Sequence, residues 1–205
     1  MDIRVPQQKY SELEINMKNS GIRSGEEYLH GLRDDREVWT RGARVRDVTI
    51  EPGIKGGAAS LASFLDRQNE DAYRENVTYL DSNGIRCATS HMAPKTKEDV
   101  LTRGRAFYEW AKWSNGMFGR TPDYKNASLM AFANATDFLA RGTVGQADFA
   151  KNMISYHDEV RLNDKILTHT LINPSVSHAQ FSTGKFDQEV ALHVVKETDS
   201  GIVVK

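Results

Sequence analysis

The sequence GRTPDY combines the signals of a helix start with two side chains that could bind an anionic oxygen. Thr121 is a favourable N-cap residue, Pro122 suits the first helical position, and Asp123 adds a negative charge to the first turn. Arg120 and Tyr124 remain, a cation and a phenol beside the free N–H groups of a helix N-terminus. Both residues could instead be purely structural: the arginine could face solvent, and the tyrosine could be a core residue whose hydroxyl reaches a loop.

A second candidate is the histidine of LTHTLINP. In an extended segment, His169 shares a face with Leu167 and Leu171, while Thr168 and Thr170 point to the other face. A histidine on an apolar face is more often a hydrogen-bonded core residue than a functional one. The spacing alone therefore leaves both interpretations open.

Other chemistries have little support in the sequence. Cys87 is the only cysteine, which excludes an internal disulfide, a cysteine zinc site and a cysteine-held iron–sulfur cluster within these residues. His157, Asp158 and Glu159 are consecutive on a predicted helix, so their side chains fan out around its axis and do not converge on a metal. There is neither a G-x-G-x-x-G motif nor a Walker loop. We expect no metal site.

Composition narrows the range of partners. The 205 residues include 27 Lys and Arg against 28 Asp and Glu, a net charge of -1, which does not favour nucleic acid or an anionic membrane. No apolar run approaches the ~18 residues of a transmembrane helix, and the N-terminus lacks the apolar core of a secretory signal. A cytoplasmic location is the expectation.

Mainly helical elements are predicted to position these candidates. Residues 1–23 are expected to be a loosely ordered leader. Helices are predicted over residues 24–34 and 54–68, from Thr96 onward, after GRTPDY, and over residues 147–162. Small hairpins are predicted around Arg41-Gly42 and around the Asn83-Gly84 turn, with strands at 38–40, 43–45, 77–80 and 85–89.

Several of these helices have a predicted packing face. Residues spaced by four, Ala127, Ala131 and Ala135, form a ridge of small side chains that would let another helix approach closely. The other faces consist of side chains at helical spacing: Ala58, Leu61, Ala62 and Leu65; Val100, Phe107, Trp110 and Ala111; and Phe149, Met153, Tyr156 and Val160.

The end of the chain has a different pattern. Residues 166–172 are predicted to be extended, and strands at 190–195 and 202–204 surround the turn signal Asp199-Ser200-Gly201. An apolar hairpin of a few residues is marginal alone in water, so these strands need further sheet. We interpret residues 24–163 as a helical domain and residues 164–205 as the beginning of a β domain in a longer protein.

Five stretches in this order resemble one family: GEEYLHGLRDDREVW, GARVRDVT, GRTPDYKNASLMA, LTHTLINP and VVKETDSGIVVK. From about residue 21 to the C-terminus, the chain is similar to the 4-hydroxyphenylacetate 3-monooxygenase family, the large components of two-component flavin-dependent phenol hydroxylases. The resemblance implies an acyl-CoA dehydrogenase-like fold: an N-terminal helical domain, a central β-barrel and a C-terminal helical bundle. This chain would contain the first and the start of the second.

The resemblance also implies roles for individual residues. Arg120 and Tyr124 would hold the oxygen of a phenolic substrate, and His169 would orient or deprotonate it. The substrate site would also include Thr121, Pro122 and Asp123. Residues implied to contact FAD are His169, Ser175, Val176, Ser177 and His178. Because members of the family often have arginine where this chain has His178, a charged contact to the cofactor phosphates is not expected from the match.

The implied activity is hydroxylation of a phenol ortho to its OH, using O₂ and reduced FAD from a separate flavin reductase, in a homo-oligomer. The related 4-hydroxybutyryl-CoA dehydratases need cysteines near the counterpart of residues 110–125, and this sequence has none there. Chlorophenol monooxygenases tend to lack the tyrosine and the histidine, whereas phenol hydroxylases of secondary metabolism stay open. A further alternative is a truncated module that has no activity alone and serves as a structural or binding unit.

Overall fold

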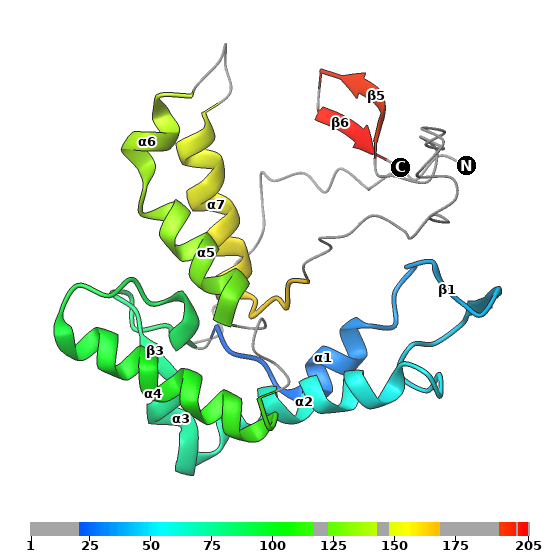
Figure 1. Ribbon diagram of the computed structural model, residues 1–205, viewed down its shortest axis with the longest axis horizontal. Helices are drawn as coiled ribbons and strands as arrows, with labels where there is room; N and C mark the ends of the chain where they lie inside the picture. The colour runs from blue at the N-terminus through cyan, green and yellow to red at the C-terminus, as the bar shows by residue number, and fades with distance from the viewer. Residues whose placement is uncertain (1–20, 117–122, 143–147, 169–192, 200, 205) are drawn as a thin grey trace, which may run out of the picture. The chain divides into compact units, whose positions relative to one another are not determined.

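The computed structural model describes residues 21–116, 123–142, 148–168, 193–199 and 201–204 (Figure 1). The chain divides into two compact units, Met1–Leu167 and Thr168–Lys205. Described residues of the first unit form helices and two small hairpins, and those of the second form one hairpin. The prediction of mainly helical structure with small hairpins is confirmed. No helix among the described residues is long and apolar enough to cross a bilayer.

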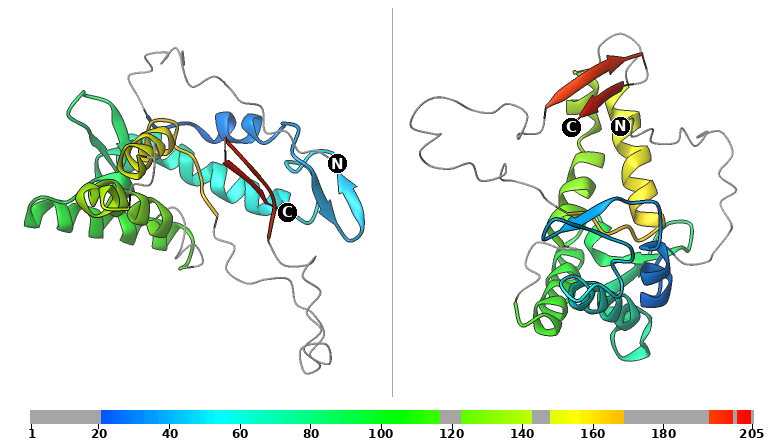
Figure 2. Two further views of the ribbon diagram at one scale, coloured as in Figure 1. Left: turned by 90° about the horizontal axis from the view of Figure 1, so that it is seen from above. Right: turned by 90° about the vertical axis from the view of Figure 1, so that its right-hand side faces the viewer.

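The first unit begins with two packed helices, α1 (Gly25–Gly31) and α2 (Lys55–Asn69), which lie side by side in Figures 1 and 2. A capping box starts α1, because Glu27 N donates to Ser24 Oγ at 3.1 Å and Ser24 N donates to Glu27 Oε2 at 2.8 Å. Tyr28 packs against Ala62 and Leu65 of α2 in a small apolar core. The predicted face of α2 is confirmed.

Glycine is required where these helices meet. A Cβ atom at Gly25 would overlap the carbonyl oxygen of Ala62 and lie 2.7 Å from Asp66 Oδ2. Gly25 N also donates to Asp66 Oδ1 at 2.8 Å, which holds the start of α1 against α2. The close approach therefore depends on the absence of a side chain at this position.

Both predicted hairpins of the first unit are present. Strands β1 (Val38–Thr40) and β2 (Ala43–Val45) flank Arg41 and Gly42, whose φ angles of 50° and 77° are those of a type I′ turn. Strands β3 (Thr78–Leu80) and β4 (Arg86–Ala88) are joined by a turn in which Gly84 has φ 76°.

Two elements beside the second hairpin were not predicted. Val77, expected in a strand, is the last residue of the helix α3 (Asp71–Val77), and Thr89 begins the 3₁₀ turn η1 (Thr89–His91). The N-cap residue of α3, Glu70, makes no side-chain capping bond, so the usual sequence signal for a helix start is missing.

The long helix α4 (Lys97–Trp113) starts with the predicted capping box, but its predicted apolar face is only partly correct, because Trp110 is buried with Phe107 packed beside it whereas the other two members are not buried. Val100 is 57% exposed and Ala111 is exposed. The buried line is Arg103, Ala106 and Trp110, which packs against α3 and η1. Arg103 was not part of the predicted face, and its guanidinium is buried against main-chain carbonyls.

The last helices of the first unit are α5 (Asp123–Ala133), α6 (Thr136–Ala140) and α7 (Phe149–Leu162), with α5 beside α7 in Figure 1. The predicted alanine ridge is wrong, because Ala131 is exposed and α5 ends before Ala135, the N-cap residue of α6. Asn126 and Met130 are the buried residues of α5.

The predicted face of α7 is correct only at its end. Val160 is fully buried, whereas Phe149 and Tyr156 are exposed, and His157 is buried where no core residue was expected. In the second unit, β5 (Val194–Thr198) pairs antiparallel with β6 (Gly201–Val204), which confirms a hairpin here. The first strand ends later than the predicted residue 195, and residues 190–192 of that prediction lie outside the described residues. Every residue of these two strands is exposed. The predicted domain boundary at residues 163–164 and the β-barrel stay predictions.

Gly25→Ala is expected to destabilise the chain by about 1–3 kcal/mol, because the added methyl overpacks the α1–α2 contact. Gly31→Ala, in the same helix, is the matched control, since a Cβ there meets nothing within 4 Å. The control should be neutral or stabilising by helix propensity. Urea unfolding of both variants measures the difference. Equal stability of the two variants would contradict the proposed close approach.

Candidate functional site

Tyr124 is the candidate substrate ligand whose side chain the structure describes. It lies in the first turn of α5, and its side chain is 46% exposed, which does not fit a core tyrosine. Lys125 Nζ lies 5.0 Å from the centre of its ring. The sequence predicted Pro122 as the first helical residue with Asp123 in the first turn, and α5 begins at Asp123. The tyrosine is therefore at the surface of a helix start.

Most of the other candidate residues lie outside the described residues, so their predicted roles stay predictions. For Asp123, the backbone is described but the side chain is not. The candidates outside the described residues are Arg120, Thr121, Pro122, His169, Ser175, Val176, Ser177 and His178.

A buried hydrogen bond holds the first turns of α5. Asn126 is 2% exposed, and its Nδ2 atom donates to Ser90 Oγ of η1 at 2.9 Å. Within α5, Ser128 Oγ donates to the carbonyl oxygen of Tyr124 at 2.8 Å. Asn126 and Ser90 were not predicted to meet, since neither residue belongs to a sequence pattern that indicates a long-range contact.

The turn η1 is itself held by a buried guanidinium. Arg103 Nη1 donates to the carbonyl oxygens of Thr89, Ser90 and Met92 at 3.2, 3.0 and 2.6 Å. The Arg103 side chain is 8% exposed, and its Cζ atom lies 5.2 Å from the centre of the Phe107 ring. Burial lowers the pKa of Arg103, but a guanidinium stays charged in proteins. The turn therefore has a fixed cation beneath its carbonyls.

Two buried histidines face each other where η1 meets α7. The ring centres of His91 and His157 are 5.3 Å apart. Among the described residues, neither ring nitrogen of His91 has a hydrogen-bond partner, and neither does Nε2 of His157. Burial is the main cause that lowers the pKa of His91 to about 3, followed by the repulsion that protonation would meet from the neighbouring His157 ring and from the guanidinium groups of Arg161 and Arg103. Burial also lowers the pKa of His157, so both rings are neutral at neutral pH.

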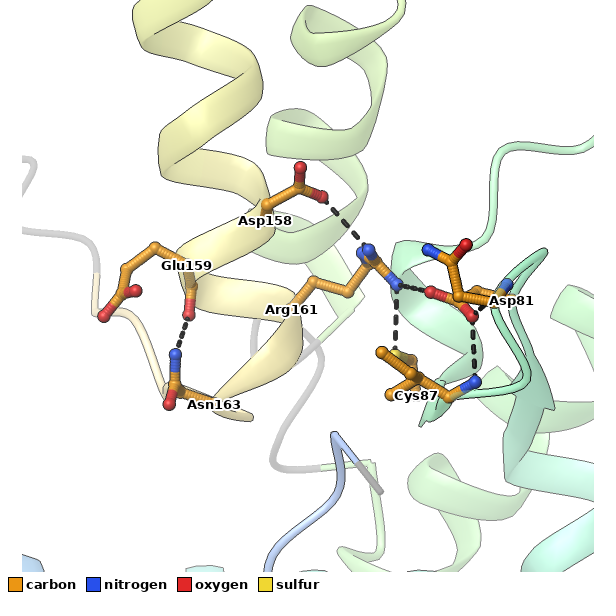
Figure 3. Close-up of polar contacts among 8 residues, drawn as sticks. Asp81, Cys87, Asp158, Glu159, Arg161 and Asn163 are labelled. Atoms are coloured by element: carbon orange, nitrogen blue, oxygen red, sulfur yellow. Dashed lines mark hydrogen bonds and ion pairs between the residues drawn. The ribbon is translucent and has the colours of Figure 1, made fainter. Parts of the chain in front are cut away.

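The end of α7 is tied to the β3–β4 hairpin by Arg161 (Figure 3). Arg161 Nη1 donates to Asp81 Oδ2 at 2.7 Å and to Cys87 Sγ at 3.2 Å. Its Nη2 donates to Asp158 Oδ1 at 3.1 Å. The side chains of Arg161 and Asp81 are only 12% and 9% exposed. This is a largely buried ion pair between residues 80 positions apart in sequence.

Burial and hydrogen bonding set the ionisation in this network. Burial alone would raise the pKa of Asp81, but hydrogen bonds from Arg161 and from the N–H groups of Ile85 and Asn83 bring that pKa below its usual value. Burial raises the pKa of Cys87 to about 11, although Arg161 opposes this. The thiol is therefore protonated at neutral pH and is a poor nucleophile.

Comparison with known proteins identifies the class of this helical unit. The family model described as "4-hydroxyphenylacetate 3-hydroxylase N terminal" matches residues 24–205. A relative from Thermus thermophilus, the 4-hydroxyphenylacetate 3-monooxygenase oxygenase component, is 38% identical over 184 residues, which cover 89% of this chain and 37% of the relative. The chain thus belongs to the family of 4-hydroxyphenylacetate 3-hydroxylases, and it spans little more than a third of that relative's length.

Solved structures agree with this assignment. The crystal structure of the oxygenase component of 4-hydroxyphenylacetate 3-monooxygenase with FAD and 4-hydroxyphenylacetate matches with a TM-score of 0.75 and 38% identity, over 89% of this chain and 37% of that one. A 4-hydroxybutyryl-CoA dehydratase from N. maritimus matches with a TM-score of 0.68 over 89% and 36% of the two chains, but at 17% identity it shows the shared fold alone.

Arg161→Ala is expected to destabilise the chain by about 3–5 kcal/mol, because it leaves the Asp81 carboxylate buried without its cation. Adding Asp81→Asn should restore part of this loss, since the amide oxygen can still accept from the turn N–H groups. Urea unfolding of the single and double variants measures the coupling. Arg105→Ala, which removes an exposed ion pair with Glu98, is the control and should cost less than about 1 kcal/mol. Additive effects at Arg161 and Asp81 would rule out a coupled pair.

The His91 ring is expected to make stability fall in acid. Its folded pKa, about 3, lies below its unfolded value, so the unfolded chain binds the proton first as pH falls. Its contribution is complete above about pH 6.5 and is lost as pH falls from there toward about 3. Burial raises the pKa of Asp164, which acts in the opposite direction and is common to all variants.

His91→Gln should therefore reduce the loss of stability between pH 7 and pH 4, even if it lowers stability at pH 7. His30→Gln, at an exposed position of α1, is the matched control. Urea midpoints of the three proteins at both pH values give the comparison. A pH dependence that His91→Gln leaves unchanged would show that this ring is not the source.

Proposed function

We propose that this chain forms the N-terminal part of the oxygenase component of a two-component phenol monooxygenase. The product would be a catechol formed by hydroxylation of 4-hydroxyphenylacetate, or of a similar phenol, ortho to its OH. The observation that carries the proposal is the family match over residues 24–205, which includes the helix start at Asp123 with Tyr124 exposed in its first turn. A relative solved with FAD and 4-hydroxyphenylacetate supports this substrate class.

In the proposed site, Arg120 and Tyr124 hold the phenol oxygen, and His169 orients or deprotonates the phenol. The helix start formed by Thr121, Pro122 and Asp123 adds the partial positive charge of its N–H groups. A free phenol has a pKa of about 10, so only ~0.1% is ionised at neutral pH. A fixed cation and hydrogen-bond donors favour the phenolate, whose ring is richer in electrons and accepts oxygen more readily.

A separate flavin reductase would supply reduced FAD. Reduced FAD would supply the electrons, and O₂ the oxygen atom that is transferred to the phenol. Hydroxyl, imidazole and main-chain groups are donors that fit hydrogen bonding to a flavin. His178 is a weaker phosphate ligand than an arginine, because an imidazole is largely neutral at neutral pH. The proposed FAD contacts are His169, Ser175, Val176, Ser177 and His178. A cytoplasmic homo-oligomer with an acyl-CoA dehydrogenase-like fold and a β-barrel start at residues 164–205 completes the proposal.

The second candidate is a module without activity of its own. It is favoured by the exposure of every residue of β5 and β6. Titrating the 205-residue chain with oxidised and reduced FAD separates the two. Saturable binding of reduced FAD supports a competent flavin site, and no binding supports the module.

In the complete oxygenase, Arg120→Ala and His169→Ala should each lower the catechol formed per reduced FAD by about 10-fold or more, the effect of removing one preorganised donor. Uncoupled release of hydrogen peroxide should rise in compensation. Product analysis and peroxide assays measure both quantities. Arg105→Ala, on the exposed surface of α4, is the matched control. An unchanged catechol yield in both variants would refute the assigned roles.

A further inference from the structure

We propose that Asn126 is a positioning residue for the phenol site, which it serves by fixing the start of α5 to the buried turn η1. The inference rests on the proposed function, because Tyr124 and Arg120 matter only if they hold the substrate. Asn126 itself is buried and is not expected to touch the phenol. Its role would be to fix the position of the side chains that contact the phenol.

The geometry of α5 places Asn126 and Tyr124 on different sides of the helix. Successive residues of a helix are about 100° apart around its axis, so residues two apart point in nearly opposite directions. Asn126 is 2% exposed and Tyr124 is 46% exposed, in agreement with this arrangement. A rotation or a shift of α5 that moved Tyr124 would therefore break the bond from Asn126 to Ser90.

The partner of Asn126 is a fixed point. Ser90 is fully buried, and its carbonyl oxygen accepts from Arg103 Nη1 at 3.0 Å while its Oγ accepts from Asn126 Nδ2 at 2.9 Å. Arg103 Nη1 also donates to the carbonyl oxygens of Thr89, the residue before Ser90, and of Met92, two residues after it. One guanidinium of α4 thereby fixes the turn to which the start of α5 is hydrogen-bonded.

Apolar packing alone would not define the register of α5 in this way. Met130, one turn further along, is buried, but apolar burial has no directional preference and tolerates small shifts. A hydrogen bond weakens steeply when its distance or angle changes. Productive substrate geometry is sensitive to displacements of about 1 Å. The Asn126–Ser90 bond supplies directional control close to the substrate ligands.

The test compares three variants in the complete oxygenase: Asn126→Ala, Ser90→Ala and their combination. Loss of the bond should lower the catechol formed per reduced FAD about fivefold and raise KM for the phenol. The combined variant should be no worse than either single one, because both remove the same bond. Asn134→Ala is the matched control, since Asn134 Nδ2 bonds the carbonyl of Met130 at the far end of α5.

A second readout follows the start of α5 directly. Hydrogen exchange of residues 124–130 in the 205-residue chain should become faster in Asn126→Ala than in Asn134→Ala, with exchange in α7 unchanged. A merely structural residue would lower the thermal midpoint without changing the coupling of flavin use to hydroxylation. Should Asn126→Ala not fold, the same measurements on Ser90→Ala decide the matter.

The outcomes separate the two proposals. If the unmodified oxygenase hydroxylates no phenol, the proposed function fails and the positioning role fails with it. Suppose instead that the unmodified oxygenase hydroxylates the phenol. If the Asn126→Ala and Ser90→Ala variants then form as much catechol per reduced FAD as Asn134→Ala, the positioning role alone is overturned. Lower coupling together with faster exchange at the start of α5 supports it.

Discussion

Burial of the main-chain carbonyls of the turn η1 is the constraint on which the helices around it depend. A buried carbonyl without a hydrogen bond costs about 1–3 kcal/mol, and those of Thr89 and Ser90 are buried here while that of Met92, the residue after the turn, is partly buried. Arg103 of α4 satisfies them with one nitrogen. The same turn receives Asn126 from α5 and faces His157 of α7 through His91. Three helices from separate parts of the chain thus meet at three consecutive residues.

The apolar cores of the first unit are small, so directional contacts carry much of the specificity between elements. One cluster lies between α1 and α2 and another between α3 and α4. Beside α2 and the residues before α1, Asp164 accepts from Gln68 Nε2 at 2.9 Å and from Arg23 N at 3.3 Å. Asp164 has φ 44°, a value that glycine adopts more readily, and its carboxylate explains why glycine does not stand there. The unfavourable backbone conformation of Asp164 is therefore offset by the hydrogen bonds that its carboxylate makes with distant segments.

Local signals made much of the fold predictable. The capping boxes at Ser24 and Thr96 and the turns at Gly42 and Gly84 depend on residues within a few positions of each other. The error in the predicted buried face of α4 has a different cause, a contact between distant segments. Arg103 is buried because carbonyls from another segment surround it, which apolar periodicity does not reveal.

In the candidate site, too, the local features were predictable and the long-range contacts were not. GRTPDY indicated a helix start, and α5 begins within that motif with Tyr124 at the surface. The support beneath it was not predictable, because Asn126 and Ser90 are 36 positions apart and belong to no recurrent spacing. Sequence therefore indicated which residues could do chemistry, whereas only the fold revealed which residues hold that helix in place.

The two kinds of contact at α5 have different physical tasks. Burial of Met130 beside α7 and η1 favours association of the helices, but it permits many nearly equivalent placements. The buried amide of Asn126 contributes less net free energy, since it exchanges one hydrogen bond for another with water. Misplacement of that amide leaves two buried polar groups unpaired, however, and this penalty selects one placement. Under the proposed function, in which Arg120 and Tyr124 hold one phenol oxygen, the start of α5 needs the second kind of contact more than the first.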